Sequence, residues 1–146
     1  MPAERRVYLD ANIFIYLLEG TPDFQRRSLH IFDEIESCGA SIYTSEITIA
    51  ECLAGARKQG ASRLVTRYMS LFTEPGAIEL VEVSRVILFD ASAIVGLTGH
   101  KLVDAIHLAT AIRMGCEVLF TNDRGIQSVD DSLVILNDAA AWKYQD

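Results

Sequence analysis

The chain has 146 residues, the length of one ordinary domain; half of them are hydrophobic and 23% are charged. This composition excludes intrinsic disorder, and no apolar run approaches the ~20 residues that a membrane span requires. The net charge of −7 argues against a protein that binds nucleic acid by charge alone. It does not exclude an enzyme whose acids hold divalent cations, because a bound metal reverses the local field.

The N-terminus and the cysteines predict a cytoplasmic protein. Residues 1–6 lead directly into an apolar strand, without the apolar segment and cleavage site of a signal peptide. Three cysteines lie far apart without C-x-x-C spacing, so we expect reduced core residues and no disulfide or zinc framework. They are Cys38, Cys52 and Cys116. The mean hydropathy of +0.21 is high for a small domain and hints at an apolar face that a partner or second copy covers.

Strands and helices are predicted to alternate from the start of the chain. Arg6–Leu9 is predicted as a buried strand, and Ile13–Glu19 as a short apolar helix that ends at Gly20. Thr21 and Pro22 then begin an amphipathic helix that ends near residue 39. Its predicted buried face consists of Phe24, Ser28, Ile31, Ile35 and Cys38.

The middle of the chain continues this alternation. Ser41–Thr44 is a predicted strand, and Ser45 is the expected N-cap of a helix that extends to about Lys58. Another helix follows Gly60 and ends at the turn formed by residues 74–76. A strand at Ile78–Val83 precedes a helix over residues 84–97.

Leu102–Met114 gives the clearest helical pattern and ends at residue 115. Its predicted buried stripe consists of Leu102, Ala105, Ile106, Ala109 and Ile112. An apolar strand at Val118–Thr121 follows. The last predicted elements are a strand at Leu133–Leu136 and a short helix around Ala139–Tyr144.

This order predicts one domain over residues 1–146, without a linker or an internal repeat. Alternating strands and helices favour a three-layer α/β/α sandwich with a mostly parallel central sheet of about five strands. Right-handed crossovers then place the carboxyl end of every strand at the same edge of the sheet. Ligands and catalytic groups gather at this edge in open α/β sheets.

Four acids are expected to meet at that edge. Asp10 and Asp123 each follow a strand, Glu51 lies in the helix after the second strand, and Asp104 lies in the first turn of its helix. A single acid at such a place is most often a solvated cap. Converging carboxylates repel one another, and Mg²⁺ or Mn²⁺ would compensate that repulsion. The pattern therefore predicts metal-dependent hydrolysis of phosphodiesters.

Four segments resemble the PIN-domain family, and most closely the VapC ribonuclease toxins of prokaryotic toxin–antitoxin pairs. They are Tyr8–Asn12, Ile49–Glu51, Leu102–Ala111 and Thr121–Gly125, in the order and at the spacing of the family. The sequence departs modestly at Ala11, where many members carry Thr or Ser, and at Ile126, where an aromatic residue is common.

The resemblance implies that Asp10, Glu51, Asp104 and Asp123 bind Mg²⁺ or Mn²⁺ and activate water to cut RNA. It implies that Asn12 and Thr121 support the acids through hydrogen bonds. Similar toxins form homodimers, and a small VapB-like antitoxin inhibits them by inserting a peptide into the acidic cleft.

Other side chains have more than one possible role. For His107 we favour a structural or substrate-positioning role over that of a catalytic base. Basic residues that could contact RNA phosphates, or form a solvated face, are Arg57, Lys58, Arg63, Arg67 and Arg124. Aromatic residues such as Tyr16 and Phe24 are expected in the core or a dimer interface.

Two other functions are alternatives to the nuclease. A PIN-like module could bind RNA or protein without cutting, although all four acidic positions are filled. A phospho-acceptor receiver domain is also small, acidic and doubly wound. It usually carries paired acids after its first strand and a lysine after its last, and this chain has neither.

Overall fold

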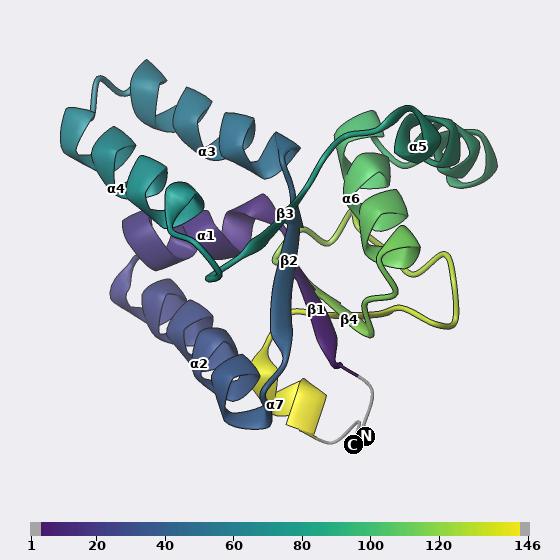
Figure 1. Cartoon of the computed structure of the whole chain (residues 1–146), viewed down its shortest axis with the longest axis horizontal. Helices are drawn as coiled ribbons and strands as arrows, with labels where there is room; N and C mark the ends of the chain where they lie inside the picture. Colours follow the sequence, from purple (N-terminus) through teal and green to yellow (C-terminus); the bar gives the residue numbers. More distant parts are fainter. Residues whose placement is uncertain (1–3, 144–146) are drawn as a thin grey trace.

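Five parallel strands form one sheet in the computed structural model, which describes residues 4–143 (Figure 1). They are β1 (Arg6–Leu9), β2 (Ser41–Ser45), β3 (Glu79–Val81), β4 (Val118–Phe120) and β5 (Val134–Leu136). Their order across the sheet is β3-β2-β1-β4-β5, and all four pairings are parallel. This arrangement confirms the predicted α/β fold with a parallel central sheet.

Helices cover both faces of this sheet (Figure 1). They are α1 (Ala11–Glu19), α2 (Pro22–Cys38), α3 (Ile47–Lys58), α4 (Ser62–Thr73), α5 (Arg85–Thr98), α6 (Leu102–Arg113) and α7 (Ala139–Lys143). One apolar core joins the sheet to α1–α4 and α7, while α5 and α6 pack on the opposite face. Strand β1 lies between β2 and β4, so its carboxyl end is at the centre of the edge.

Successive residues of β1 serve the two faces in turn, as the period of a strand requires. Val7 and Leu9 belong to the core under α1 and α2, whereas Tyr8 packs against Leu108 of α6. All three side chains are fully buried. Tyr8 thereby carries a polar hydroxyl group into the layer beneath α6.

Several predicted boundaries and faces were wrong. Ser45 ends β2, and Glu46 is the N-cap residue of α3, although the Ser45 hydroxyl still accepts a hydrogen bond from the Ile47 amide at 3.1 Å. Cys38 is exposed, whereas the other two cysteines are buried. The predicted C-terminal helix is present as α7, and Tyr144 lies outside the described residues.

Helix α6 differs most from its prediction. Leu102, expected in a buried stripe, is 57% exposed, and burial is continuous from Ala105 to Ala111 instead of following one face. The helix is enclosed on nearly all sides because it lies between the sheet and α5. Within residues 4–143, no single helix is long and apolar enough to cross a membrane; only α5 and α6 taken together reach that length, and they are bent by 119°.

Candidate active site

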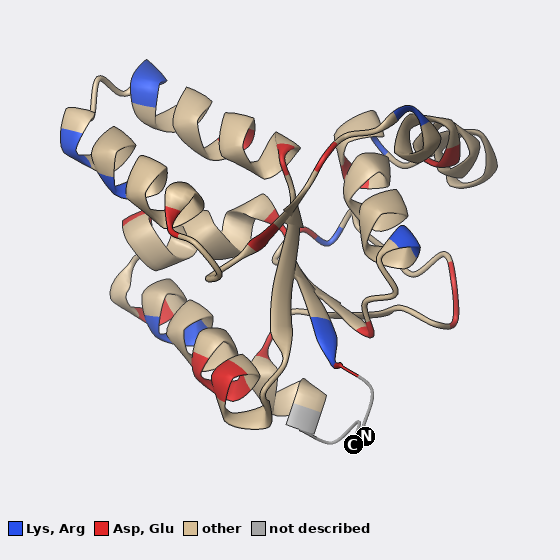
Figure 2. Ribbon diagram, in the orientation of Figure 1, with Lys and Arg blue, Asp and Glu red and all other residues tan. Residues whose placement is uncertain are grey.

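The structure brings the four predicted acids to the carboxyl edge of the sheet. Asp10 directly follows β1, and Asp123 comes three residues after the end of β4. Glu51 lies in the second turn of α3, and Asp104 in the first turn of α6. In Figure 2 several acidic segments (red) lie near the ends of the strands.

Asp10 is a rigid member of this cluster, because it is only 5% exposed and donors surround its carboxylate. Its Oδ1 accepts a hydrogen bond from the Ala11 amide at 2.7 Å, which makes Asp10 the N-cap of α1. Its Oδ2 accepts hydrogen bonds from the Thr121 hydroxyl at 2.7 Å and from the side-chain amide of Asn12 at 3.0 Å. This cap explains why α1 begins at Ala11 rather than at the predicted Ile13.

Asn12 and Thr121 extend these hydrogen bonds to the loop that carries Asp123. The Asn122 backbone amide donates to Asn12 Oδ1 at 3.1 Å, and the Asp123 amide donates to Thr121 Oγ1 at 2.9 Å. Thr121 Oγ1 also accepts from Asn12 Nδ2 at 3.2 Å. Both side chains therefore have the geometry expected of groups that support the acids.

The His107 ring contacts both Glu51 and Asp10 through one nitrogen. Its ring is fully buried, and Nε2 lies 2.7 Å from Glu51 Oε1 and 3.3 Å from Asp10 Oδ1. On the opposite side of the ring, Nδ1 lies 2.6 Å from the Tyr8 hydroxyl, which also accepts a hydrogen bond from the Ser45 amide at 3.0 Å. The Tyr8 side chain is the member of the site that sequence reasoning missed.

Tyr8 determines which nitrogen of the neutral His107 ring carries the proton. Burial raises the pKa of the Tyr8 hydroxyl well above its ordinary value, so the group stays protonated and acts as a hydrogen-bond donor. His107 Nδ1 lies 2.6 Å from this hydroxyl, and when it accepts the hydrogen bond the proton of the neutral ring resides on Nε2. The opposite tautomer would direct the lone pair of Nε2 at two carboxylates.

In the charged ring both nitrogens carry hydrogen, so Nε2 is protonated in that form too. One ligand atom each from Asp10, Glu51 and His107 lies within 4.8 Å of the others, a spacing at which the three could surround a metal ion. A protonated Nε2 has no free lone pair for such an ion. The geometry therefore gives His107 the structural role of a donor to Glu51. A substrate-positioning role for this residue stays a prediction.

Asp104 and Asp123 form the other half of the cluster, beside Gly125. A Cβ atom added to Gly125 would lie 3.0 Å from Asp123 Oδ1 and 3.9 Å from Asp104 Oδ2, so the absence of a side chain leaves this space to the carboxylates. The Gly125 amide donates to Asp123 Oδ1 at 2.8 Å. Among the described residues, Asp104 has neither a hydrogen-bond donor nor an ion-pair partner, although the charges of His107 and Lys101 act on it from beyond ion-pair distance.

The electrostatics match a crowded group of acids in which His107 is the buried basic side chain. Burial, followed by the negative charges of Asp123 and Asp10, raises the pKa of Asp104. Burial also raises the pKa of Asp10, against the opposing effects of His107 and Thr121. Burial lowers the pKa of His107, but the Glu51 hydrogen bond and the neighbouring acids outweigh it and raise that pKa.

These donors fit a hard divalent cation. The four groups offer only carboxylate oxygens, which Mg²⁺ and Mn²⁺ prefer, and Asp104 has both oxygens free of protein donors within residues 4–143. A cation at this edge would offset the burial, and the repulsion by Asp123 and Asp10, that raise the pKa of Asp104. The acids and their surroundings therefore suit the expected metal.

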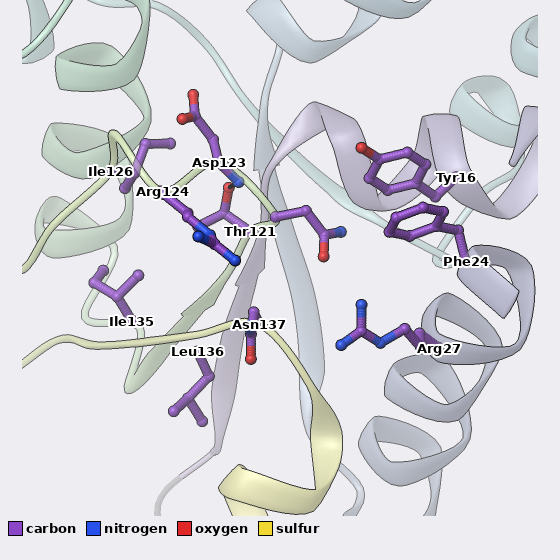
Figure 3. Close-up of a pocket in the computed structure, with 11 residues that line it drawn as sticks. Tyr16, Phe24, Arg27, Thr121, Asp123, Arg124, Ile126, Ile135, Leu136 and Asn137 are labelled. Carbon is purple, nitrogen blue, oxygen red and sulfur yellow. Dashed lines mark hydrogen bonds between the residues drawn. The ribbon is translucent and has the colours of Figure 1, made fainter.

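The predicted basic residues lie in two different places. Arg57 and Lys58 end α3, and Arg57 is six residues beyond Glu51, or roughly 9 Å along the helix axis. Arg63 and Arg67 are on α4, and Figure 2 shows basic segments (blue) at the outer ends of this helix pair. Arg124 is different, because it lines a pocket of about 530 Å³ next to Asp123 (Figure 3).

Comparison with known proteins agrees with this architecture. The family model of the PIN domain matches residues 7–132. A toxin–antitoxin complex from Klebsiella pneumoniae superimposes with a TM-score of 0.66 at 24% identity, over 88% of this chain and 95% of that chain. A Rickettsia felis VapBC complex bound to promoter DNA gives a TM-score of 0.70 at 18% identity, over 90% and 97% of the two chains.

A Mycobacterium tuberculosis VapC toxin, described as cleaving the sarcin-ricin loop, gives a TM-score of 0.67 at 11% identity, over 81% and 90% of the two chains. A sequence comparison with curated proteins gives no significant match. At these identities the solved structures establish the fold, while the family model covers most of the chain. The chain belongs to the PIN-domain family.

Proposed function

We propose that the chain is a metal-dependent endoribonuclease and the toxin of a toxin–antitoxin pair. The carrying observation is Asp104, a partly buried carboxylate near Asp123 that has no protein donor and no ion-pair partner among the described residues. An acid in that environment is destabilised unless a cation joins it. Asp10, Glu51 and Asp123 complete a set of oxygen ligands around the same edge.

In this proposal the ion would be Mg²⁺ or Mn²⁺, held by Asp10, Glu51, Asp104 and Asp123. When bound, it would lower the pKa of a water molecule and stabilise negative charge on a phosphate. Asp10 is held still by Ala11, Thr121 and Asn12, so it fixes one side of the ligand set. His107 donates to Glu51 and holds that carboxylate toward Asp10.

Similar structures support RNA as the substrate. One of them is a toxin described as cleaving the sarcin-ricin loop, and two others are toxin–antitoxin or VapBC complexes. On this basis we propose that the chain cuts RNA, that a VapB-like antitoxin inhibits it, and that this inhibits translation. Action in the cytoplasm remains a prediction from the sequence.

The order of the strands rejects one alternative function. Receiver domains place their strands in the order 2-1-3-4-5, whereas β1 here lies between β2 and β4. Together with the PIN-domain match, this topology shows that the receiver reading was wrong. A PIN-like module that binds without cutting is the alternative that an activity assay must separate.

Cleavage of RNA by the purified protein tests the proposal. We expect activity with Mg²⁺ or Mn²⁺, loss of activity with a chelator, and loss to the level of the chelated enzyme in the Asp10→Asn variant. Asp33→Asn is the matched control, because Asp33 is an exposed acid on α2 away from the edge. Cleavage that survives both the chelator and Asp10→Asn contradicts the metal site, and metal binding without any cleavage favours the binding module.

A further inference from the structure

A pocket of about 530 Å³ continues the acidic edge away from the metal ligands (Figure 3). Thr121 and Asp123 form its wall toward the acids, and Arg27, Arg124 and Asn137 form other parts of its lining. We propose that this pocket binds the nucleotide adjoining the cleaved bond in single-stranded RNA, with arginines at its phosphate and an aromatic platform under its base. This proposal rests on the proposed ribonuclease function.

Two guanidinium groups enter the pocket from opposite sides. Figure 3 shows Arg27 reaching in from α2 and Arg124 from the loop after β4. Both side chains are exposed, and within residues 4–143 neither has a carboxylate partner. Arg26, the neighbour of Arg27 on α2, instead forms an ion pair with Asp23. In a chain of net charge −7, this pair of arginines offers a local site for phosphate beside the acids.

Aromatic rings form another part of the same pocket. The rings of Tyr16 and Phe24 are stacked, with centroids 4.4 Å apart and planes 14° from parallel. Both are partly exposed rather than core residues, so the core is not their place, and the dimer interface that was the other expectation stays a prediction. Arg27 Cζ lies 5.9 Å from the Phe24 centroid, so the ring also positions the guanidinium.

The turn between α1 and α2 builds this platform. Gly20 donates its amide to the Tyr16 carbonyl at 3.0 Å, and a Cβ atom there would lie 2.5 Å from that carbonyl oxygen and 3.1 Å from Phe24 Cβ. Only glycine allows this close approach, which brings the two rings together. Bases of any sequence stack on such rings in proteins that bind single-stranded nucleic acid.

The position of the pocket favours RNA over a separate small ligand. Asp123 belongs both to the acidic cluster and to the pocket lining, so a phosphate at the acids and a nucleotide in the pocket can be neighbours in one strand. Asn122 and Asn137 also line the pocket and offer amide donors and acceptors to a base or a ribose. An acidic peptide could meet the arginines, but it would make no use of the aromatic platform.

Binding of RNA by matched arginine variants tests the phosphate contact. The full-length chain carrying Asp10→Asn serves as the background, and the probe is a labelled single-stranded oligouridine followed by fluorescence anisotropy. We expect Arg27→Gln to raise the Kd by about tenfold. The slope of log Kd against log salt concentration should also fall by about one, as for the loss of one phosphate contact. Arg26→Gln is the control on the same helical turn, and it should change neither quantity.

A second comparison isolates the aromatic platform. Phe24→Leu keeps an apolar side chain but removes the ring. It should weaken the binding of oligouridine by about tenfold and leave the binding of an abasic backbone of the same length unchanged. Phe32→Leu, a partly buried aromatic on the same helix α2 outside the pocket lining, is its control. In the catalytically intact chain, Arg27→Gln should raise KM with kcat nearly unchanged, as expected for lost binding rather than lost chemistry.

The outcomes separate this proposal from the function on which it rests. If the parent chain cuts RNA while Arg27→Gln and Phe24→Leu bind oligouridine as the parent does, the nucleotide pocket is overturned and the ribonuclease stands. If the parent neither binds nor cuts RNA, the ribonuclease itself fails. If Arg27→Gln retains RNA but loses an oligoglutamate probe, the pocket is a site for acidic peptides and the nucleotide assignment is wrong.

Discussion

Fully buried at the centre of the acidic edge, the His107 ring is hydrogen-bonded to the Tyr8 hydroxyl on one side and faces two carboxylates on the other. The three side chains form a line from Tyr8 in the sheet to Glu51 on α3. Ser45 closes this line by donating its amide to the Tyr8 oxygen. These buried hydrogen bonds therefore fix which atoms donate, and the last donor, His107 Nε2, points at Glu51.

Removal of the Tyr8 hydroxyl should weaken both the fold and the metal site. Tyr8→Phe leaves the Ser45 amide and His107 Nδ1 buried without partners, which should cost about 1–3 kcal/mol in the free energy of unfolding. The ring of His107 then loses its fixed tautomer, and we expect Mn²⁺ affinity to fall about 10–100-fold. Chemical denaturation and calorimetric titration measure the two effects.

Two control variants distinguish positioning from ligation. Tyr43→Phe removes a tyrosine hydroxyl from the adjacent strand β2, and it should leave Mn²⁺ affinity unchanged. His107→Gln keeps an amide donor toward Glu51, so it should retain far more affinity than His107→Leu. Equal loss of affinity in both His107 variants would mean that Nε2 itself binds the metal, and it would refute the tautomer assigned above.

Asp104 should make the metal-free protein less stable as the pH rises. Burial and the charges of Asp123 and Asp10 raise its folded pKa above the ordinary value of 3.8, so the folded state keeps a proton that the unfolded state has lost. The free energy of unfolding then falls as the pH rises from the ordinary pKa of 3.8 to the raised pKa of the folded state. Asp104→Asn removes this loss, so the variant should be more stable than the parent at neutral pH without metal.

Denaturation curves across the acidic range, with and without Mg²⁺, measure this effect. Added Mg²⁺ should stabilise the parent more than Asp104→Asn, because only the folded parent has the complete ligand set. Asp130 provides a contrast, since hydrogen bonds to Ser132 lower its pKa and it therefore stabilises the fold above that pKa. An Asp104→Asn variant that is less stable than the parent at neutral pH would show that Asp104 has a structural partner.

Among the helices and strands, local patterns were sufficient for the type of nearly every element. Apolar strands followed by capped helices predicted β1 as Arg6–Leu9 and placed α2 between Pro22 and residue 39. Asp10 and Asp123 were singled out because each follows a strand, and Asp104 because it opens a helix; Glu51 was placed by the helix that follows the second strand. A parallel sheet brings these points to one edge. These inferences need only neighbours in the sequence.

Contacts between distant residues could not be predicted in this way. Tyr8 and His107 are 99 residues apart, and each alone has the pattern of an ordinary core position. The continuous burial of α6 depends on α5, which covers the side that a surface helix would expose. The pocket joins α1, α2 and the loop after β4, so neither Arg27 nor Phe24 carries a local signal of binding.

For the molecule as a whole, the outer surface of α5 and the start of α6 are unusually apolar. Exposed side chains there are Val86, Leu88, Phe89, Leu97, Leu102 and Val103. The inner face of α5 is also apolar, with Ile87 and Ala91 buried. A helix that is hydrophobic on both faces is normally covered on both. Figure 2 shows few charged segments along this helix, in contrast to α2.

This surface leads us to expect a homodimer through α5 and the start of α6. Phe89 is 68% exposed and Leu97 is 86% exposed, so polar replacements there should not disturb the monomer fold. Phe89→Gln combined with Leu97→Gln should convert a dimer into a monomer in analytical ultracentrifugation. Leu29→Gln on α2 and Met69→Gln on α4 are controls of similar exposure on other surfaces, and both should remain dimeric.

Assembly through this face should also affect the site. Val103 is exposed directly beside Asp104, so a partner packed on the start of α6 would lie next to the acidic edge. We expect the monomeric variant to keep its metal affinity, because all four acids belong to one chain, but to cut RNA with a higher KM. A dimer that persists in the double variant would move the interface elsewhere and leave the apolar face for another protein, with the inhibitory partner as the first to test by co-purification.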